Sequence, residues 1–178
     1  MQTELSVSSP THDQLVKWRV FLETAMALID IVDDELQSAQ GLSLRWYDVL
    51  VNLEEASEQN ESGGLPMNEL AARILSSKSG LTRVVDRMEE AGLLRRERPP
   101  DDRRVVRVLI TPKGIETLQA AREVHHLSIH QHFTEHLRDR DLTAVANALE
   151  KVHRHVRPRR PERIGDGTPA GQARRPRA

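Results

Sequence analysis

A group of small hydroxyl side chains and basic side chains lies on residues 77–87, where the spacing of apolar residues indicates a helix. Such a helix can bind a polyanion, because the N–H groups at its N-terminus attract phosphate and an arginine can donate two hydrogen bonds to guanine. A glycine in this group permits close approach of the backbone. The residues predicted to contact nucleic acid are Ser77, Lys78, Ser79, Gly80, Thr82, Arg83 and Arg87.

A second group of arginines follows, on a segment that is expected to form a two-stranded β-hairpin. Strands are predicted over residues 93–98 and 105–110, and ProProAspAsp between them is typical of a turn. Arg103 and Arg104 would lie at the hairpin tip, where a guanidinium can enter a narrow minor groove. Asp102 would hold the neighbouring arginine extended. Contacts to DNA phosphates along the strands are expected from Arg95, Arg96, Arg98 and Arg107.

Histidines form a third group, beyond the hairpin. His126 and His130 are four residues apart, as are His132 and His136, and this spacing allows metal binding from one face of a helix. A metal site needs a further converging ligand, so histidines that face solvent or give pH sensitivity are the alternatives. His126 and His130 are the candidate metal ligands, and no cofactor is otherwise expected.

The elements that position these residues follow from the same periodicity. A short helix over residues 67–75, a serine turn and the helix that ends before Gly92 make a helix-turn-helix. Ser76 or Ser77 is predicted to cap the second of these helices. The hairpin that follows makes the unit a winged helix-turn-helix.

Long amphipathic helices are predicted on both sides of the winged unit. Thr111 and Pro112 are typical of an N-cap and of a first helical residue. The apolar stripes on these helices exceed what one small winged domain can cover, so a homodimer is expected. The predicted helices span residues 13–38, from an N-cap at Ser43 to a loop at 58–66, from 112 to about Arg138, and 139–156.

The expected fold class is therefore mainly α with a small β-hairpin wing, a winged helix-turn-helix flanked by long dimerisation helices. The predicted parts are a disordered leader (1–12), one regulator domain (13–156) and a disordered tail rich in arginine and proline (157–178). Within the domain, the dimerisation helices span 13–58 and 112–156, and the DNA-binding unit spans 65–111.

Composition narrows the classes of protein. The 178-residue chain has a net charge of −1, but residues 76–113 carry 10 basic and 6 acidic side chains, a local net charge of +4 that favours a polyanion. The absence of cysteine excludes disulfides, thiolate metal sites and iron–sulfur clusters. Because neither a signal peptide nor an apolar run of about 18 residues is visible, a cytoplasmic protein without a membrane partner is expected.

The stretch from Leu70 to Gly114 resembles the core of the MarR (multiple antibiotic resistance regulator) family. The shared features are SerGlyLeuThrArgValValAspArg in the recognition helix, GluAlaGlyLeu at its end, AspArgArg in the wing and LeuIleThrProLysGly after the wing. The flanking helices follow the same order, so the resemblance extends over about residues 13–156. It implies a homodimeric transcription regulator that binds a palindrome in double-stranded DNA, with Arg104 as the minor-groove residue and Asp102 as its salt-bridge partner.

The resemblance also implies a small-molecule effector. Regulators of this family are often switched by small anionic aromatic ligands bound between the dimer helices and the winged unit, so a ligand-responsive repressor is expected. The predicted walls of such a site are Trp18, Arg45, Trp46 and Tyr47. A place in the hydrophobic core is the alternative for the three aromatic residues.

Two other functional classes are alternatives to DNA binding. A winged helix can act as a protein-interaction module without specific DNA binding, but the basic face of the recognition helix and the basic hairpin tip argue against this. An enzyme is not expected, because the sequence has no glycine-rich phosphate loop, no HExxH and no nucleophile elbow.

Overall fold

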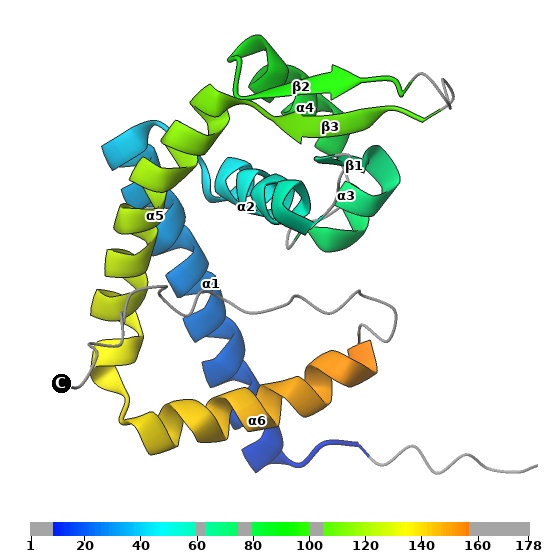
Figure 1. Ribbon diagram of the computed structural model, residues 1–178. Coiled ribbons are helices and arrows are strands. Elements are labelled where there is room, and N and C mark those ends of the chain that lie inside the picture. Colours follow the sequence, from blue (N-terminus) through cyan, green and yellow to red (C-terminus); the bar gives the residue numbers. More distant parts are fainter. Residues whose placement is uncertain (1–8, 60–62, 75–79, 100–104, 157–178) are drawn as a thin grey trace, which may run out of the picture.

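The computed structural model describes residues 9–59, 63–74, 80–99 and 105–156. A winged unit lies at one end of a pair of long helices, and a last helix crosses the other end (Figure 1). The elements are α1 (His12–Gln40), α2 (Leu44–Gln59), β1 (Gly64–Pro66), α3 (Met67–Arg73), α4 (Leu81–Glu90), β2 (Leu94–Glu97), β3 (Arg107–Ile110), α5 (Pro112–His132), a 3-10 turn η1 (Thr134–His136) and α6 (Asp139–Val156). The predicted fold class is confirmed: the chain is mainly helical with a small antiparallel sheet.

The core of the winged unit is built around α2. Its side chains Val49, Leu50, Leu53 and Ala56 are completely buried, as expected for a helix that is apolar on most sides. Ser43 caps this helix as predicted, because its Oγ accepts a hydrogen bond of 3.2 Å from the Trp46 N–H group. The other fully buried core residues include Leu65, Leu70, Val85, Met88 and Val108 from the sheet, α3 and α4.

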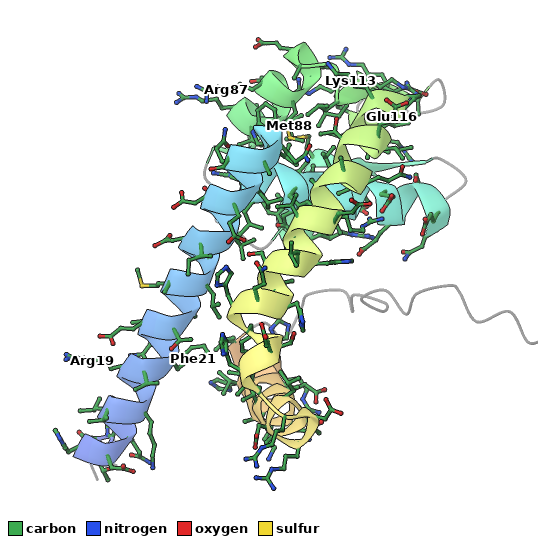
Figure 2. All side chains as sticks on the ribbon, turned by 90° about the vertical axis from the view of Figure 1, so that its left-hand side faces the viewer. Arg19, Phe21, Arg87, Met88, Lys113 and Glu116 are labelled. Carbon is green, nitrogen blue, oxygen red and sulfur yellow. The ribbon has the colours of Figure 1, made fainter. Side chains whose placement is uncertain are left out.

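The long helices α1 and α5 pack side by side (Figure 2). Val32 and Leu36 of α1 are buried, and so are Leu118 and Ala121 of α5. Phe21 points from α1 toward α5, whereas Arg19 points away from it (Figure 2). Among the described residues, none of the helices combines the length and the apolar character needed to cross a bilayer.

The motif LeuIleThrProLysGly anchors the start of α5 to the winged unit. Thr111 caps α5 as predicted, since its Oγ1 accepts a hydrogen bond of 3.0 Å from the Gly114 N–H group. The same hydroxyl donates to the carbonyl of Gly92 at 2.7 Å. Lys113 donates through Nζ to the carbonyl of Ala91 at 2.7 Å. The end of the recognition helix is therefore fixed directly to the long helix.

The sheet has three strands, not the two that were predicted. Residues 64–66, which were expected to lie in a loop, form β1 and pair antiparallel with β3, so that the strand order is β1-β3-β2. This strand could hardly be predicted from local patterns, because it is three residues long and ends in proline. Gly64 suits the edge of the sheet, since a Cβ there would lie 2.7 Å from Leu109 Cγ.

Three predicted helix boundaries also need correction. Gly80, with a φ of 76°, is the N-cap of α4, so the helix begins at Leu81 and not directly after Ser76 or Ser77, which lie outside the described residues. The helix α3 ends at Arg73, because the following residue is extended. The helix α5 ends at His132 rather than near Arg138, because the next residue leaves helical geometry and the chain then turns through η1 into α6. Residues 1–8 and 157–178, most of the predicted leader and the whole predicted tail, lie outside the described residues.

Candidate nucleic-acid interface

The helix α4 has the two faces that its sequence predicted. Leu81, Val85 and Met88 are buried against the core. Thr82, Arg83, Asp86 and Arg87 are exposed on the opposite side. In Figure 2, Arg87 points out of the molecule, whereas Met88 points inward. The buried face fixes the rotation of the helix about its axis, and so it determines which side chains a ligand can reach.

The N-terminal end of α4 is only partly described. Gly80 is exposed and lies in the left-handed region of φ, where a glycine is strongly favoured. A Cβ at this position would meet no atom within 4 Å, so the backbone angle rather than a lack of space requires the glycine. Ser77, Lys78 and Ser79, which were predicted to contact DNA, lie outside the described residues, as do Asp102, Arg103 and Arg104 of the wing.

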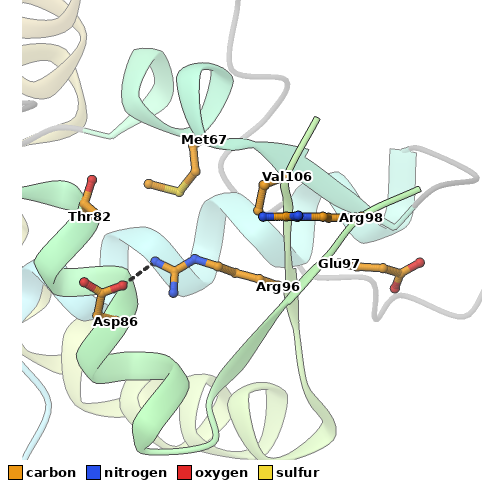
Figure 3. Close-up of a pocket in the computed structure, with 7 residues that line it drawn as sticks. All are labelled: Met67, Thr82, Asp86, Arg96, Glu97, Arg98 and Val106. Atoms are coloured by element: carbon orange, nitrogen blue, oxygen red, sulfur yellow. Dashed lines mark hydrogen bonds and ion pairs between the residues drawn. The ribbon is translucent and has the colours of Figure 1, made fainter. Parts of the chain in front are cut away.

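An open cleft of about 680 Å³ separates α4 from the wing (Figure 3). Thr82 and Asp86 line it from α4, and Arg96 and Arg98 line it from the wing side. Arg98 is exposed and forms no ion pair with another described residue. The cleft therefore presents the hydroxyl of Thr82 and the exposed guanidinium of Arg98 between two elements that were both predicted to contact DNA.

Arg96 lies differently from the other wing arginines. Its guanidinium donates to Asp86 Oδ1 at 2.6 Å and to Glu89 Oε2 at 2.5 Å. Its backbone N–H donates to Glu89 Oε1 at 2.8 Å. Burial alone would lower the pKa of Arg96, but the hydrogen bonds to the two carboxylates raise it above its usual value. This arginine was predicted to face DNA phosphates along the strand, and instead it faces α4.

The four residues predicted to form an effector site do not lie together in one chain. Tyr47 is buried and stacks on His125, with ring centroids 4.4 Å apart. Trp46 is partly buried against the core. Arg45 precedes it on α2 and is also partly buried. Trp18 is 56% exposed and its ring contacts Phe21, one turn further along α1.

The distance along α1 explains this separation. The α2 helix is anchored to α1 where Asp33 Oδ1 accepts the Leu44 N–H at 2.6 Å. Trp18 is 15 residues earlier on α1 than Asp33, which corresponds to roughly 22 Å along a helix axis. A site that contains Trp18 and the α2 residues together would need a second chain.

An ion pair beside Tyr47 was not predicted from the sequence. Arg122 of α5 forms an ion pair with Glu54 of α2, and the two are 68 positions apart in the chain. Burial would lower the pKa of Arg122, whereas hydrogen bonds to Glu54 and Tyr47 raise it. No local pattern could have indicated this pair, because its members come from helices that meet only in the folded chain.

The histidines of α5 are divided among separate partners. His132 Nε2 lies 2.8 Å from Glu35 Oε1, and His130 Nδ1 lies 3.1 Å from Thr134 Oγ1. His126 is exposed. Within the described residues, no three histidine, cysteine or acidic side chains converge so that they could hold a metal ion. His126 and His130 are therefore not supported as metal ligands by this arrangement.

Comparison with known proteins is consistent with this architecture. A family model described as MarR family matches residues 40–105. The transcriptional repressor MprA of Escherichia coli is 31% identical over 98 residues, which make up 55% of this chain and 53% of that protein, so the match spans about half of MprA. Sco3205, a MarR family transcriptional regulator from Streptomyces coelicolor, was solved in complex with DNA; it is 26% identical, with a TM-score of 0.77 over 88% of this chain and 95% of that chain.

AbsC, a MarR family transcriptional regulator from Streptomyces coelicolor, is similar along its whole length. It is 33% identical, and the alignment covers 86% of this chain and 100% of that chain with a TM-score of 0.75. The resemblance predicted from the recognition helix and the wing is thereby confirmed. With its winged unit, its pair of long helices and this likeness to AbsC, the chain belongs to the MarR family of transcriptional regulators.

Proposed function

We propose that the chain is a homodimeric, sequence-specific DNA-binding transcription regulator, with α4 in the major groove and the wing in the minor groove. The exposed face of α4 is the observation that carries this proposal. Arg83 and Arg87 stand on that face, and neither forms an ion pair with another described residue. Both guanidiniums are therefore available for base edges or phosphates. The DNA complex of the similar protein Sco3205 supports the same use of the fold.

The dimer is supported by the apolar surface of α1. Ala25, Leu28, Val32 and Leu36 form the stripe that packs in the chain, as their partial or complete burial shows. Two further apolar stripes flank it and are exposed. One contains Leu15, Trp18, Leu22, Met26 and Ile29, and the other contains Val16, Val20 and Ile31. At about 100° per residue, the two exposed stripes lie roughly 150° apart around the helix.

Two exposed apolar stripes on opposite sides of α1 can be buried only if other helices pack against both sides. A soluble monomer seldom leaves apolar patches of this extent in water. The helix α6 offers a matching surface, because Val145, Leu149, Val152 and Val156 are exposed at steps of three and four. We infer an interlocked homodimer, in which α1 of each chain is held between helices of its partner. Such a dimer presents two recognition helices, as a palindromic site requires.

A small anionic or aromatic effector is the further part of the proposal. Its site would lie where α1, α2 and α5 meet, with Arg45, Trp46 and Tyr47 on α2. One chain does not bring Trp18 to this place, so a site that also contains Trp18 would need the helices of the partner chain. Binding that favours one spacing of the recognition helices would shift the affinity for DNA.

Fluorescence anisotropy tests the proposal. Wild-type protein is titrated onto labelled DNA from upstream of its own coding region, and onto a scrambled duplex, across a range of salt concentrations. We expect tight binding to the first duplex, weak binding to the second, and loss of the difference in Arg104→Ala. Equal and weak binding of wild-type protein to both duplexes, and to a genomic pool of fragments, would favour a protein-interaction module instead.

A further inference from the structure

We propose that Arg96 is a positioning residue, which sets the angle between the recognition helix and the wing through Glu89 and Asp86 and does not itself contact DNA. This inference rests on the proposed function. It concerns how the two DNA-binding elements are held relative to each other. Because α4 and the wing would enter neighbouring grooves, their separation has to match that of the grooves.

The covalent connection between α4 and β2 lies at one end only. The chain turns at Ala91 and Gly92, where the N–H groups of Gly92 and Leu93 bond to carbonyls in the last turn of α4 at 2.9 and 3.0 Å. Beyond this turn, the two elements diverge on either side of the cleft (Figure 3). Arg96 is three residues past Leu93, which is roughly 10 Å along a strand. A contact at that distance resists opening far better than the turn alone.

Arg96 spans the cleft at this point. Figure 3 shows its side chain reaching from β2 to Asp86 on α4. Asp86 and Glu89 are three residues apart on the helix and so share one side of it. One planar guanidinium bonds to both carboxylates, and Glu89 also accepts the backbone N–H of the same arginine. Backbone and side chain of one strand residue are thereby fixed to the helix.

Charge gives a second reason for this arrangement. Two carboxylates on a helix that faces DNA would repel phosphate unless a cation neutralises them. The side chain of Arg96 is only 25% exposed, and its donors already point at these carboxylates. Contact with a phosphate would require Arg96 to break the bonds to α4. The guanidinium of Arg98, which lines the same cleft and pairs with no described residue, is the better phosphate contact.

Arg95 provides a matched control. It is the neighbour of Arg96 on β2, but it pairs with Glu97 of the same strand, and both side chains are about half exposed. This pair lies within β2 and does not attach the strand to α4. Replacing Arg95 by lysine therefore keeps the charge of the strand, as replacing Arg96 by lysine does, but it does not loosen the attachment to α4.

The first experiment keeps the positive charge at residue 96 but removes the planar guanidinium group that bonds to two carboxylates. Arg96→Lys and Arg95→Lys are compared with wild-type protein by anisotropy on the operator across a salt series. A lysine cannot bond to both carboxylates as a planar guanidinium does, so we expect Arg96→Lys to bind about tenfold more weakly with an unchanged salt slope. Arg95→Lys keeps the positive charge that the predicted phosphate contact of Arg95 needs, and it leaves the attachment of β2 to α4 intact, so it should stay within about twofold of wild type. Near-wild-type binding by Arg96→Lys, or a salt slope lower by about one, would identify Arg96 as a phosphate contact and overturn the proposal.

In the second experiment, the direction of the change in DNA affinity distinguishes a positioning role from simple electrostatics. Glu89→Gln removes a negative charge beside the DNA and keeps an oxygen that can accept the Arg96 N–H. Electrostatics alone predicts tighter binding, whereas loss of the positioning contact predicts binding about fivefold weaker. Glu90→Gln, the exposed neighbour, is the control and should bind as wild type or slightly more tightly. Tighter binding by Glu89→Gln would contradict a positioning role.

Thermal unfolding and the dimer mass are measured for every variant, so that a loss of fold is not mistaken for a loss of positioning. The wild-type titration distinguishes failure of the proposed DNA binding from failure of the positioning role of Arg96. Selective binding by wild-type protein with no effect of Arg96→Lys or Glu89→Gln would leave the proposed function standing and remove this inference. No binding by wild-type protein to any duplex would remove both.

Discussion

The backbone of Gly114 lies directly against the carbonyl group of Leu93. A Cβ on Gly114 would stand 2.1 Å from the Leu93 oxygen, well inside the contact distance of two heavy atoms. That oxygen also accepts the N–H of Thr111 at 3.1 Å. The first turn of α5 and the turn that follows α4 are thus in contact without an intervening side chain. The start of α5 therefore cannot shift toward this turn without displacing the Leu93 carbonyl group.

This contact predicts a large effect of Gly114→Ala. The added methyl group would collide with backbone that cannot move without breaking the Thr111 hydrogen bond, so we expect a loss of about 2–3 kcal/mol in the free energy of unfolding. Gly41→Ala is the control, since a Cβ there meets nothing within 4 Å and only the φ of 62° is unfavourable. Urea denaturation measures both. Equal effects of the two substitutions would mean that the helix start can shift away from Leu93.

Glu35 predicts a dependence of stability on pH. The hydroxyl of Ser128 and then the ring of His132 hold the pKa of Glu35 below its ordinary value of 4.5. The folded state therefore favours the ionised form, and the resulting stabilisation is fully present above pH 4.5 and disappears as the pH falls through the lower folded pKa. We expect Glu35→Gln to be less stable than wild type at pH 7, with a difference that shrinks on acidification. Urea unfolding of both proteins at pH 7 and at acidic pH measures this difference in stability. Asp34→Asn, at an exposed neighbour, should show no comparable shrinkage; a constant difference for Glu35→Gln would refute the assignment.

The apolar stripes predict where the dimer can be broken. Leu22→Asp together with Leu149→Asp places carboxylates on an exposed stripe of α1 and on that of α6, where a dimer would bury them. We expect light scattering to give the monomer mass at concentrations where wild type is dimeric. Lys151→Asp lies on the opposite face of α6 and should leave the dimer intact. A dimer that survives both leucine substitutions would place the interface elsewhere.

Arg83 predicts a change in sequence discrimination. If its guanidinium donates to a base edge, Arg83→Ala should reduce the preference for the operator over a scrambled duplex by about 1–3 kcal/mol while nonspecific affinity changes less. Anisotropy with both duplexes gives the two affinities. Equal losses on the two duplexes, with a salt slope lower by about one, would instead make Arg83 a phosphate contact.

The sequence by itself determined the elements whose signals are local. The two faces of α4, the Ser43 and Thr111 caps and the long amphipathic helices depend on residues within one or two turns of each other, so their periodicity and capping chemistry predicted them correctly. The exposed arginines of the candidate interface followed from the same periodicity, because the buried side of α4 fixes the side that remains free.

Only the tertiary structure decided the contacts between residues that are distant in the chain. The strand β1 exists because β3, more than 40 positions later, offers it hydrogen bonds. The pairs of Arg122 with Glu54 and of His132 with Glu35 join helices whose packing sets their distance. Arg96 was assigned to DNA because its charge is visible in the sequence, whereas its direction depends on how the wing folds back against α4. Burial and distance between elements are properties of packing, and no local pattern specifies them.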